Sequence, residues 1–177
     1  MLKKIAFLIV LLVAAVLVYA AFKPDSFRVE RSITIKAPPA KVQALIEDFT
    51  QWQAWSPWEH IDPTLKRDMS GAPRGVGAVY SWKGDGKAGQ GRMEIVESKP
   101  GALVKIKLDF IKPFPSNNIA EFTLQPEGGD STRVNWAMYG ASPYMVKLMT
   151  TFVSMDSMVG KDFEQGLASM KAAAEKP

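Results

Sequence analysis

Residues 91–110 read GRMEIVESKPGALVKIKLDF, and this stretch decides the fold that we expect for the chain. Two strand-like runs, Gly91 to Ser98 and Leu103 to Phe110, are separated only by a turn segment around Lys99 to Gly101. A connection this short joins antiparallel neighbours, because a parallel crossover needs a dozen residues or more. The stretch therefore predicts a β-hairpin.

Further strand candidates lie on both sides of this hairpin: Gly77 to Lys83 before it, and Ile119 to Gln125 and Thr132 to Met138 after it. The segments Gly84 to Gly91 and Pro126 to Asp130 are rich in turn residues and short enough for hairpin connections. The sequence offers no crossover helix between these strands. It therefore predicts an antiparallel meander and excludes a doubly wound parallel sheet.

A strand and a short helix precede the meander. Residues Phe27 to Lys36 alternate between apolar and polar side chains, which is the period of a half-buried strand. Arg31 interrupts the apolar face, so we do not expect that face to be uniformly dry. Pro38 and Pro39 then open a helix, where a missing N–H costs nothing. Its buried stripe comprises Val42, Leu45, Ile46 and Phe49.

The chain closes with apolar residues at steps of three and four, and the segment from Thr151 to Ala174 contains no proline. This pattern predicts a long amphipathic helix that buries its stripe on the sheet. Gly160 and Gly166 lower helix propensity, so we expect close packing or a bend at these positions. The stripe comprises Met149, Phe152, Met155, Val159, Phe163, Leu167 and Met170.

The N-terminal segment from Ile5 to Phe22 carries no charge and is bracketed by Lys3 and Lys4 before it and Lys23 after it. As a helix that rises about 1.5 Å per residue it spans roughly 27 Å, close to the hydrocarbon core of a bilayer at about 30 Å. It therefore predicts one membrane-spanning helix in an anchor of residues 1–23, followed by a single domain of residues 24–177.

A cleaved signal peptide is the alternative for this segment, since Val18 and Ala20 suit the small-residue positions before a cut. Against it stand the length of the apolar run and the lack of a Gly or Pro break before Lys23. If the helix is retained, Lys3 and Lys4 keep the N-terminus cytoplasmic by the positive-inside rule. The domain then lies on the non-cytoplasmic side, which in a bacterium is the periplasm or the outer face.

Charge and cysteine content exclude several classes of function. The formal net charge is +4, but three of the 22 basic side chains flank the apolar N-terminus and the rest nearly balance the 18 acidic ones. This balance argues against the clustered positive field of a nucleic-acid binder. The chain has no Cys, so it has neither disulfides, a thiolate nucleophile nor a thiolate metal site.

The stretch from Trp52 to Trp58 places three tryptophans three residues apart. One interpretation is a core plug, because aromatics at helical spacing usually pack inside. The other is the aromatic wall of a cavity, because Pro57 prevents a regular helix and leaves the rings on an irregular lid. The sequence leaves both interpretations open.

Catalytic and metal-binding patterns do not assemble in this sequence. His60 is the only histidine, and its neighbours Glu59 and Asp62 are too close in sequence to form a triad or a full metal ligand set with it. Gly84, Gly86 and Gly89 spell G-x-G-x-x-G, but a strand pattern follows where a dinucleotide site needs a helix. We therefore predict no catalytic residues, no metal site and no cofactor.

Arg92 and Glu94 alternate with Met93 and Ile95, so one pair faces the interior and the other faces outward. If Met93 and Ile95 face inward, the charged pair is an ordinary solvated one. In the opposite register, a buried Arg92–Glu94 pair would orient a polar ligand head or act as acid and base. The alternation favours the first register.

Four segments in this order resemble the polyketide cyclase/dehydrase and lipid-transport family of the START-like (SRPBCC) superfamily. They are FRVERSITIKAP (Phe27 to Pro38), WQAWSPW (Trp52 to Trp58), GQGRMEI (Gly89 to Ile95) and GKDFEQGL (Gly160 to Leu167). The resemblance implies an α+β helix-grip fold, in which a curved antiparallel sheet grips a long C-terminal helix around a cavity for an apolar molecule. It does not imply an enzyme, because function resides in the site and not in the fold.

We therefore expect a membrane-tethered protein that binds or transports a hydrophobic small molecule or lipid. A cyclase-type or other enzyme of the same fold is one alternative, and it requires an inward-facing titratable group with a shifted pKa. A protein-interaction module with a filled core is another, and it would show little internal volume. The expected ligand-binding lining comprises Trp55, Trp58, Tyr80, Trp82, Met93, Ile95, Phe110, Trp136, Phe152 and Met155.

Overall fold

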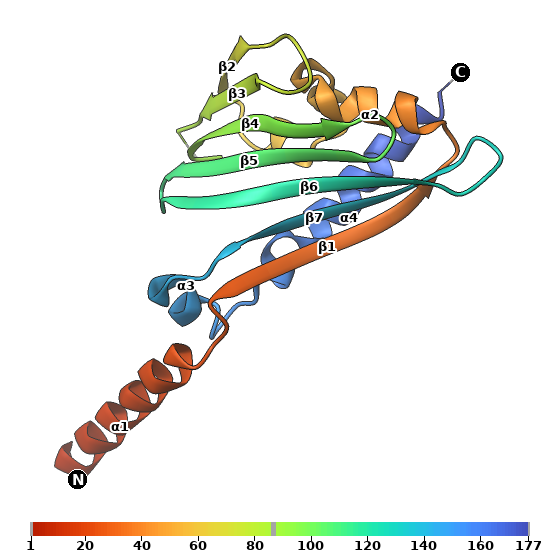
Figure 1. Ribbon diagram of the computed structural model, residues 1–177. Helices are drawn as coiled ribbons and strands as arrows, with labels where there is room; N and C mark the ends of the chain where they lie inside the picture. The colour runs from red at the N-terminus through yellow and green to blue at the C-terminus, as the bar shows by residue number, and fades with distance from the viewer. Residues whose placement is uncertain (1, 86–87, 177) are drawn as a thin grey trace.

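Seven strands, among residues 2–85 and 88–176 that the computed structural model describes, form one curved antiparallel sheet in the order β1-β7-β6-β5-β4-β3-β2 (Figure 1). The C-terminal helix lies against this sheet, and the N-terminal helix projects away from it. The elements are α1 (Leu2–Ala21), β1 (Ser26–Ile35), α2 (Pro39–Glu47), η1 (Phe49–Ala54), η2 (Pro57–His60), β2 (Lys66–Gly71), β3 (Ala78–Lys83), β4 (Gln90–Lys99), β5 (Leu103–Lys112), β6 (Ser116–Pro126), β7 (Thr132–Ala141), α3 (Tyr144–Met149) and α4 (Met155–Ala174).

The sequence-based meander is confirmed for β3 to β7, and the fold is the predicted helix grip. The two strands of each hairpin are antiparallel. Strand β1 forms one edge of the sheet and pairs with β7 along its full length. The strand that sequence reasoning missed is β2 at the far edge. All six of its residues are exposed, so its sequence KRDMSG lacks the apolar alternation that marks a half-buried strand.

The two faces of the sheet differ in chemistry. On β4, Met93 and Ile95 point inward and are buried, whereas Arg92 and Glu94 lie outside and pair with each other at 2.8 Å. This is the register that the alternation favours. The outer face continues across β5 and β6 as a ladder of ion pairs, such as the 3.6 Å contact of Lys105 with Glu121. The inner face therefore holds the apolar core.

The predicted helix from Thr151 is wrong at its N-terminal end, because the chain breaks there into α3 and α4. Ser154 has an extended backbone, and its hydroxyl accepts a hydrogen bond of 3.1 Å from the Ser157 N–H, which makes it the N-cap of α4. Phe152 consequently lies in the connection between the two helices and not on the buried stripe.

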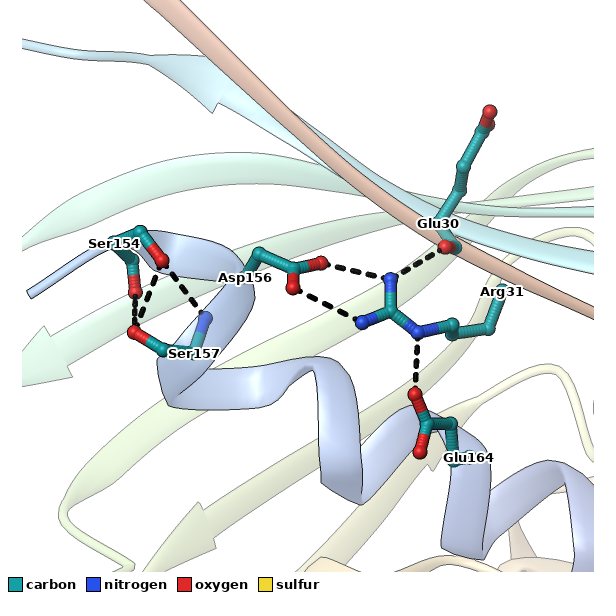
Figure 2. A network of polar contacts seen from close by, with 6 residues as sticks. All are labelled: Glu30, Arg31, Ser154, Asp156, Ser157 and Glu164. Carbon is teal, nitrogen blue, oxygen red and sulfur yellow. Dashed lines mark hydrogen bonds and ion pairs between the residues drawn. The ribbon is translucent and has the colours of Figure 1, made fainter.

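Arg31 joins β1 to α4 across the inner face (Figure 2). Its guanidinium donates to Asp156 and to Glu164, each at 2.7 Å. A Cβ on Gly160 would lie 2.4 Å from the Arg31 Nη2, so this glycine leaves space for the guanidinium to approach α4. The arrangement explains both the charge on an otherwise apolar strand face and the glycine in the helix.

Candidate ligand-binding site

Helix α4 covers only part of the inner face. Among the described residues, its polar contacts with β1 begin at Arg31, which binds Asp156, and end at Thr34, whose carbonyl accepts from Lys171 Nζ at 2.9 Å. Strand β1 begins five residues earlier, at Ser26, next to the end of α1. We call the part of the inner face under α4 the closed end and the part toward the start of β1 the open end.

The closed end is filled by stacked aromatic rings. Trp136 lies parallel to Phe163 of α4, with ring centroids 4.2 Å apart and planes 4° from parallel. On its other side, Trp136 stacks with Phe122 at 5.0 Å. A Cβ on Gly166 would lie 2.8 Å from Trp136 Cζ3, so the glycine is needed for this close approach. We call Phe122, Trp136 and Phe163 the ring stack.

The tryptophans of η1 and η2 surround this stack. Trp55 and Trp58 each meet Trp136 edge to face at 5.5 Å. The Trp55 indole N–H donates to the Leu45 carbonyl at 2.9 Å, and Trp52 donates to the Ile46 carbonyl at 3.0 Å. Trp52 and Trp55 are therefore satisfied parts of the packed core, which is the first of the two interpretations that the sequence left open. Trp58 is half-buried at the border of this core.

The inward-facing side chains are less completely buried toward the open end. Along β5 the exposed fraction rises from 0% at Ile106 to 8% at Leu108, and Phe110 is only half-buried. The paired strand β4 repeats the gradient, from 0% at Ile95 to 8% at Met93. Because all of these side chains are on the inner face, the loss of burial reflects what covers them and not which way they point.

Trp82 and Phe110 form the rim of the open end. Their rings meet edge to face at 5.9 Å, and the Trp82 indole N–H donates to the Ala88 carbonyl at 3.0 Å. A Cβ on Gly91 would lie 2.2 Å from the Trp82 ring, so the ring lies directly over this glycine. Phe27, at the start of β1, is also half-buried. The rim is therefore apolar and partly accessible.

Asn118 supplies a polar atom to the open end. It faces inward in the same register row as Leu108 and is 6% exposed. Its Oδ1 has no hydrogen-bond partner among the described residues, while its Nδ2 contacts Ser116 Oγ at 3.3 Å. The amide lies over Gly140, where a Cβ would come within 2.2 Å of Oδ1. An unpartnered buried carbonyl is costly, so this atom is suited to accept a hydrogen bond from a ligand or a water.

A buried acid joins Tyr80 to β2. Glu59 is 5% exposed and accepts hydrogen bonds of 2.6 Å from both the Tyr80 hydroxyl and Arg67 Nε. Burial of the phenol raises the pKa of Tyr80, and its hydrogen bond to Glu59 raises it further. The spacing of Glu59, Arg67 and Tyr80 in the sequence gives no signal for this network, because three separate elements bring it together.

The remaining candidates for chemistry lie apart. His60 is exposed, with its Nε2 3.0 Å from the Gln53 carbonyl oxygen, and Asp62 accepts from the Thr64 hydroxyl at 2.6 Å. Among residues 2–85 and 88–176, no group of three or more His, Asp or Glu side chains is arranged to hold a metal. Of the glycine motif, Gly86 lies outside the described residues, and strand β4 follows Gly89 where a phosphate site needs a helix.

Most of the predicted lining residues do come together on the inner face. Phe152 does not: it is 72% exposed, because the break before α4 removes it from the helical stripe. Met155 is half-buried at the first turn of α4. Trp55, Tyr80, Met93, Ile95 and Trp136 are buried in one core, and Trp58, Trp82 and Phe110 pack half-buried against it.

Two hollows of the described surface lie away from this core. One is beside Lys3, Lys4 and Phe7 on α1, and the other is beside α2, where Gln43 and Arg74 contribute to its wall. Neither lies between the sheet and α4.

Solved structures with the same fold come from several bacteria. A protein from Chromobacterium violaceum has a TM-score of 0.57 at 16% identity, with 88% of this chain and 100% of that chain covered. A protein from Mesorhizobium loti has a TM-score of 0.59 at 17% identity, covering 85% and 100%. The Aha1 dimer from Colwellia psychrerythraea has a TM-score of 0.57 at 18% identity, covering 84% and 96%. At these identities the likeness shows the fold alone.

Among curated proteins, none has a sequence that matches this chain significantly. The sequence profile described as polyketide cyclase/dehydrase and lipid transport matches residues 26–175, which cover β1 to α4. The inner apolar face and the gripped C-terminal helix agree with that match. The chain therefore belongs to the polyketide cyclase/dehydrase and lipid-transport family.

Proposed function

We propose that this protein binds and carries a hydrophobic small molecule or lipid at the open end of its inner face, while α1 tethers it to a membrane. The observation that carries the proposal is the gradient of burial. The apolar inner face is tightly filled at the ring stack and loosens toward the end of the sheet from which α1 departs. The least tightly packed apolar surface thus lies nearest the proposed membrane.

The tether rests on α1. Its most apolar window has a mean hydropathy of 2.6, and only 6% of that window is buried against the rest of the protein. A helix of this length and exposure is unstable in water but suits a bilayer core. Lys3 and Lys4 at its start favour a cytoplasmic N-terminus, so the domain would lie on the non-cytoplasmic side.

The chemistry of the open end indicates the class of ligand. Phe27, Trp82, Leu108 and Phe110 offer apolar contact, and burial at about 25 cal/mol per Å² would give several kcal/mol for a ligand that covers a few hundred Å². Asn118 Oδ1 offers one acceptor inside this surface. A mostly apolar molecule with one hydroxyl or other donor group fits both features.

Tyr80 supports a second candidate function, an enzyme of the same fold. It is an inward-facing titratable group with a shifted pKa, as the enzyme interpretation requires. Two facts weigh against it. The Tyr80 hydroxyl already donates to Glu59, and its pKa moves further above neutrality, whereas an efficient acid or base has a pKa near the working pH.

A fluorescent fatty-acid titration of the detergent-purified full chain tests the proposal. We expect Phe110→Ala and Trp82→Ala to weaken the probe by roughly 1–3 kcal/mol each, because each removes apolar contact at the rim. The matched control is Val96→Ala, on the outer side of the same sheet, where Val96 is 42% exposed. Equal affinity of all three variants and the wild type would contradict binding at the open end.

Tyr80→Phe separates the two candidate functions, with His60→Ala and Glu94→Gln as controls. Both control side chains lie away from the inner face, so probe binding should change little in either variant. Tyr80→Phe keeps the ring and removes the hydroxyl. Turnover of a bound compound that disappears in Tyr80→Phe while probe affinity persists would favour the enzyme. Mass spectrometry of molecules extracted from the native protein would supply the compounds for that assay.

A further inference from the structure

Large apolar side chains lie exposed in the segment between β7 and α4, although this segment is short and ordered as a helix and a turn. Met145 is 71% exposed and Phe152 is 72% exposed. By contrast, the one basic residue of α3, Lys147, is only 8% exposed. This is the reverse of a helix that faces water. The exposed set, here called the α3 patch, comprises Tyr144, Met145, Met149, Phe152 and Val153.

Polar contacts fix the α3 patch beside the C-terminal end of α1, as their neighbouring positions in Figure 1 also show. The Tyr144 hydroxyl donates to the Leu17 carbonyl at 3.0 Å. Lys147 Nζ binds the Asp25 carboxylate at 2.5 Å, just after α1 ends, and Lys23 Nζ donates to the Thr150 carbonyl. The α3 patch therefore has a defined position along the axis of α1 and is not part of an untethered loop.

When α1 spans a membrane, that position along its axis corresponds to the boundary between lipid chains and headgroups. Leu17 lies four residues before the end of α1, which at about 1.5 Å per residue is roughly 6 Å along the helix axis. Apolar side chains of interfacial segments penetrate roughly 5–10 Å into this boundary, and tyrosine is enriched there. Tyr144 and Lys23 are thus positioned as residues of the interface, with Met145 and Phe152 available to enter the acyl region.

We propose that the α3 patch inserts into the lipid surface beside α1 and seats the domain on the bilayer. A lipid surface is favoured as the occupant because the patch adjoins the exposed apolar surface of α1. Both apolar surfaces are stabilised by contact with lipid chains. The inference rests on the membrane tether of the proposed function. Its consequence is that the start of β1, and with it the open end, is held close to the bilayer and the ligand path is short.

Site-specific fluorescence in vesicles tests this placement. The chain has no cysteine, so each single-cysteine variant carries one environment-sensitive label. The variants are Met145→Cys and Phe152→Cys in the α3 patch, and Leu12→Cys in the middle of α1. The matched control is Met69→Cys, since Met69 is 42% exposed on β2 at the opposite edge of the sheet from β1. The full chain is reconstituted into phosphatidylcholine and phosphatidylglycerol vesicles with or without brominated lipid.

We expect brominated lipid to remove on the order of half of the emission at positions 145 and 152, as it does at position 12, and little at position 69. Quenching at position 12 with positions 145 and 152 like the control would overturn the seating and leave the tether intact. A blue-shifted label at 145 or 152 without quenching would indicate that a protein partner, and not lipid, covers the α3 patch. This result would overturn the proposal. Absence of quenching at position 12 would remove the tether itself, and with it the seating that rests on the tether.

Discussion

The two ends of the inner face are built from the same kinds of residue and behave differently. At the closed end, Trp136 is held between Phe122 and Phe163 and is 2% exposed. At the open end, Trp82 stacks on Tyr80 at 6.2 Å and meets Phe110 edge to face at 5.9 Å, yet Trp82 and Phe110 both stay half-buried. The difference is the cover that α4 provides. An aromatic side chain is a core residue where a helix closes over it and a candidate contact for a ligand where none does.

The largest contrast should appear in stability. We expect Trp136→Ala to lower the free energy of unfolding by roughly 3–5 kcal/mol, because the removed ring leaves a cavity in a closely packed stack. Trp82→Ala should cost about half as much or less, because its ring is half-buried. Urea unfolding monitored by circular dichroism gives both values. Equal costs would mean that the two ends are packed alike and would end the distinction.

The glycines of α4 sharpen the same comparison. Gly166→Ala should destabilise by about 1–3 kcal/mol, because its Cβ would meet the rigid ring of Trp136 at 2.8 Å. Gly160→Ala should cost less, since its Cβ would meet the flexible end of Arg31, and alanine favours the helix by about 1 kcal/mol. The thermal midpoints of the two variants test the order. A less stable Gly160→Ala would show that the ring stack has room to adjust.

The smallest effect concerns the ion pair that fixes the start of α4. The hydrogen bond from Arg31 lowers the pKa of Asp156 below its usual value of 3.8. The resulting stabilisation is present above about pH 4 and is lost as the pH falls through the lower folded pKa. Asp156→Asn should therefore be less stable than the wild type at neutral pH, and the difference in thermal midpoint should shrink on acidification. A difference that is constant with pH would show that the charge is not the cause.

Sequence reasoning found the strands whose inner and outer faces differ in polarity, and it failed where that signal is missing. Strand β2 is exposed on both faces, so no alternation marks it. The break at Ser154 is a local capping event inside an otherwise continuous apolar stripe, and this break moved Phe152 out of the core.

The residues of the site could be predicted from the sequence, but not how each of them is packed. Trp82 and Trp136 both appeared as lining residues, but their difference depends on where α4 begins. The Glu59–Tyr80 contact joins η2 to β3, and Arg31 finds Asp156 on a helix 125 positions further along the chain. Such pairings follow from the packing of distant elements, which a single sequence does not reveal.

Photo-crosslinking with a diazirine-bearing fatty acid tests the central claim most directly. The full chain is irradiated in detergent with the probe at a concentration that saturates binding, and the modified residues are mapped by mass spectrometry. Binding at the open end predicts adducts on the segments around Trp82 and on Leu108 to Phe110, reduced when an unlabelled fatty acid competes. Adducts that are confined to the outer face or to α1, or that no competitor reduces, would contradict a ligand site on the inner face.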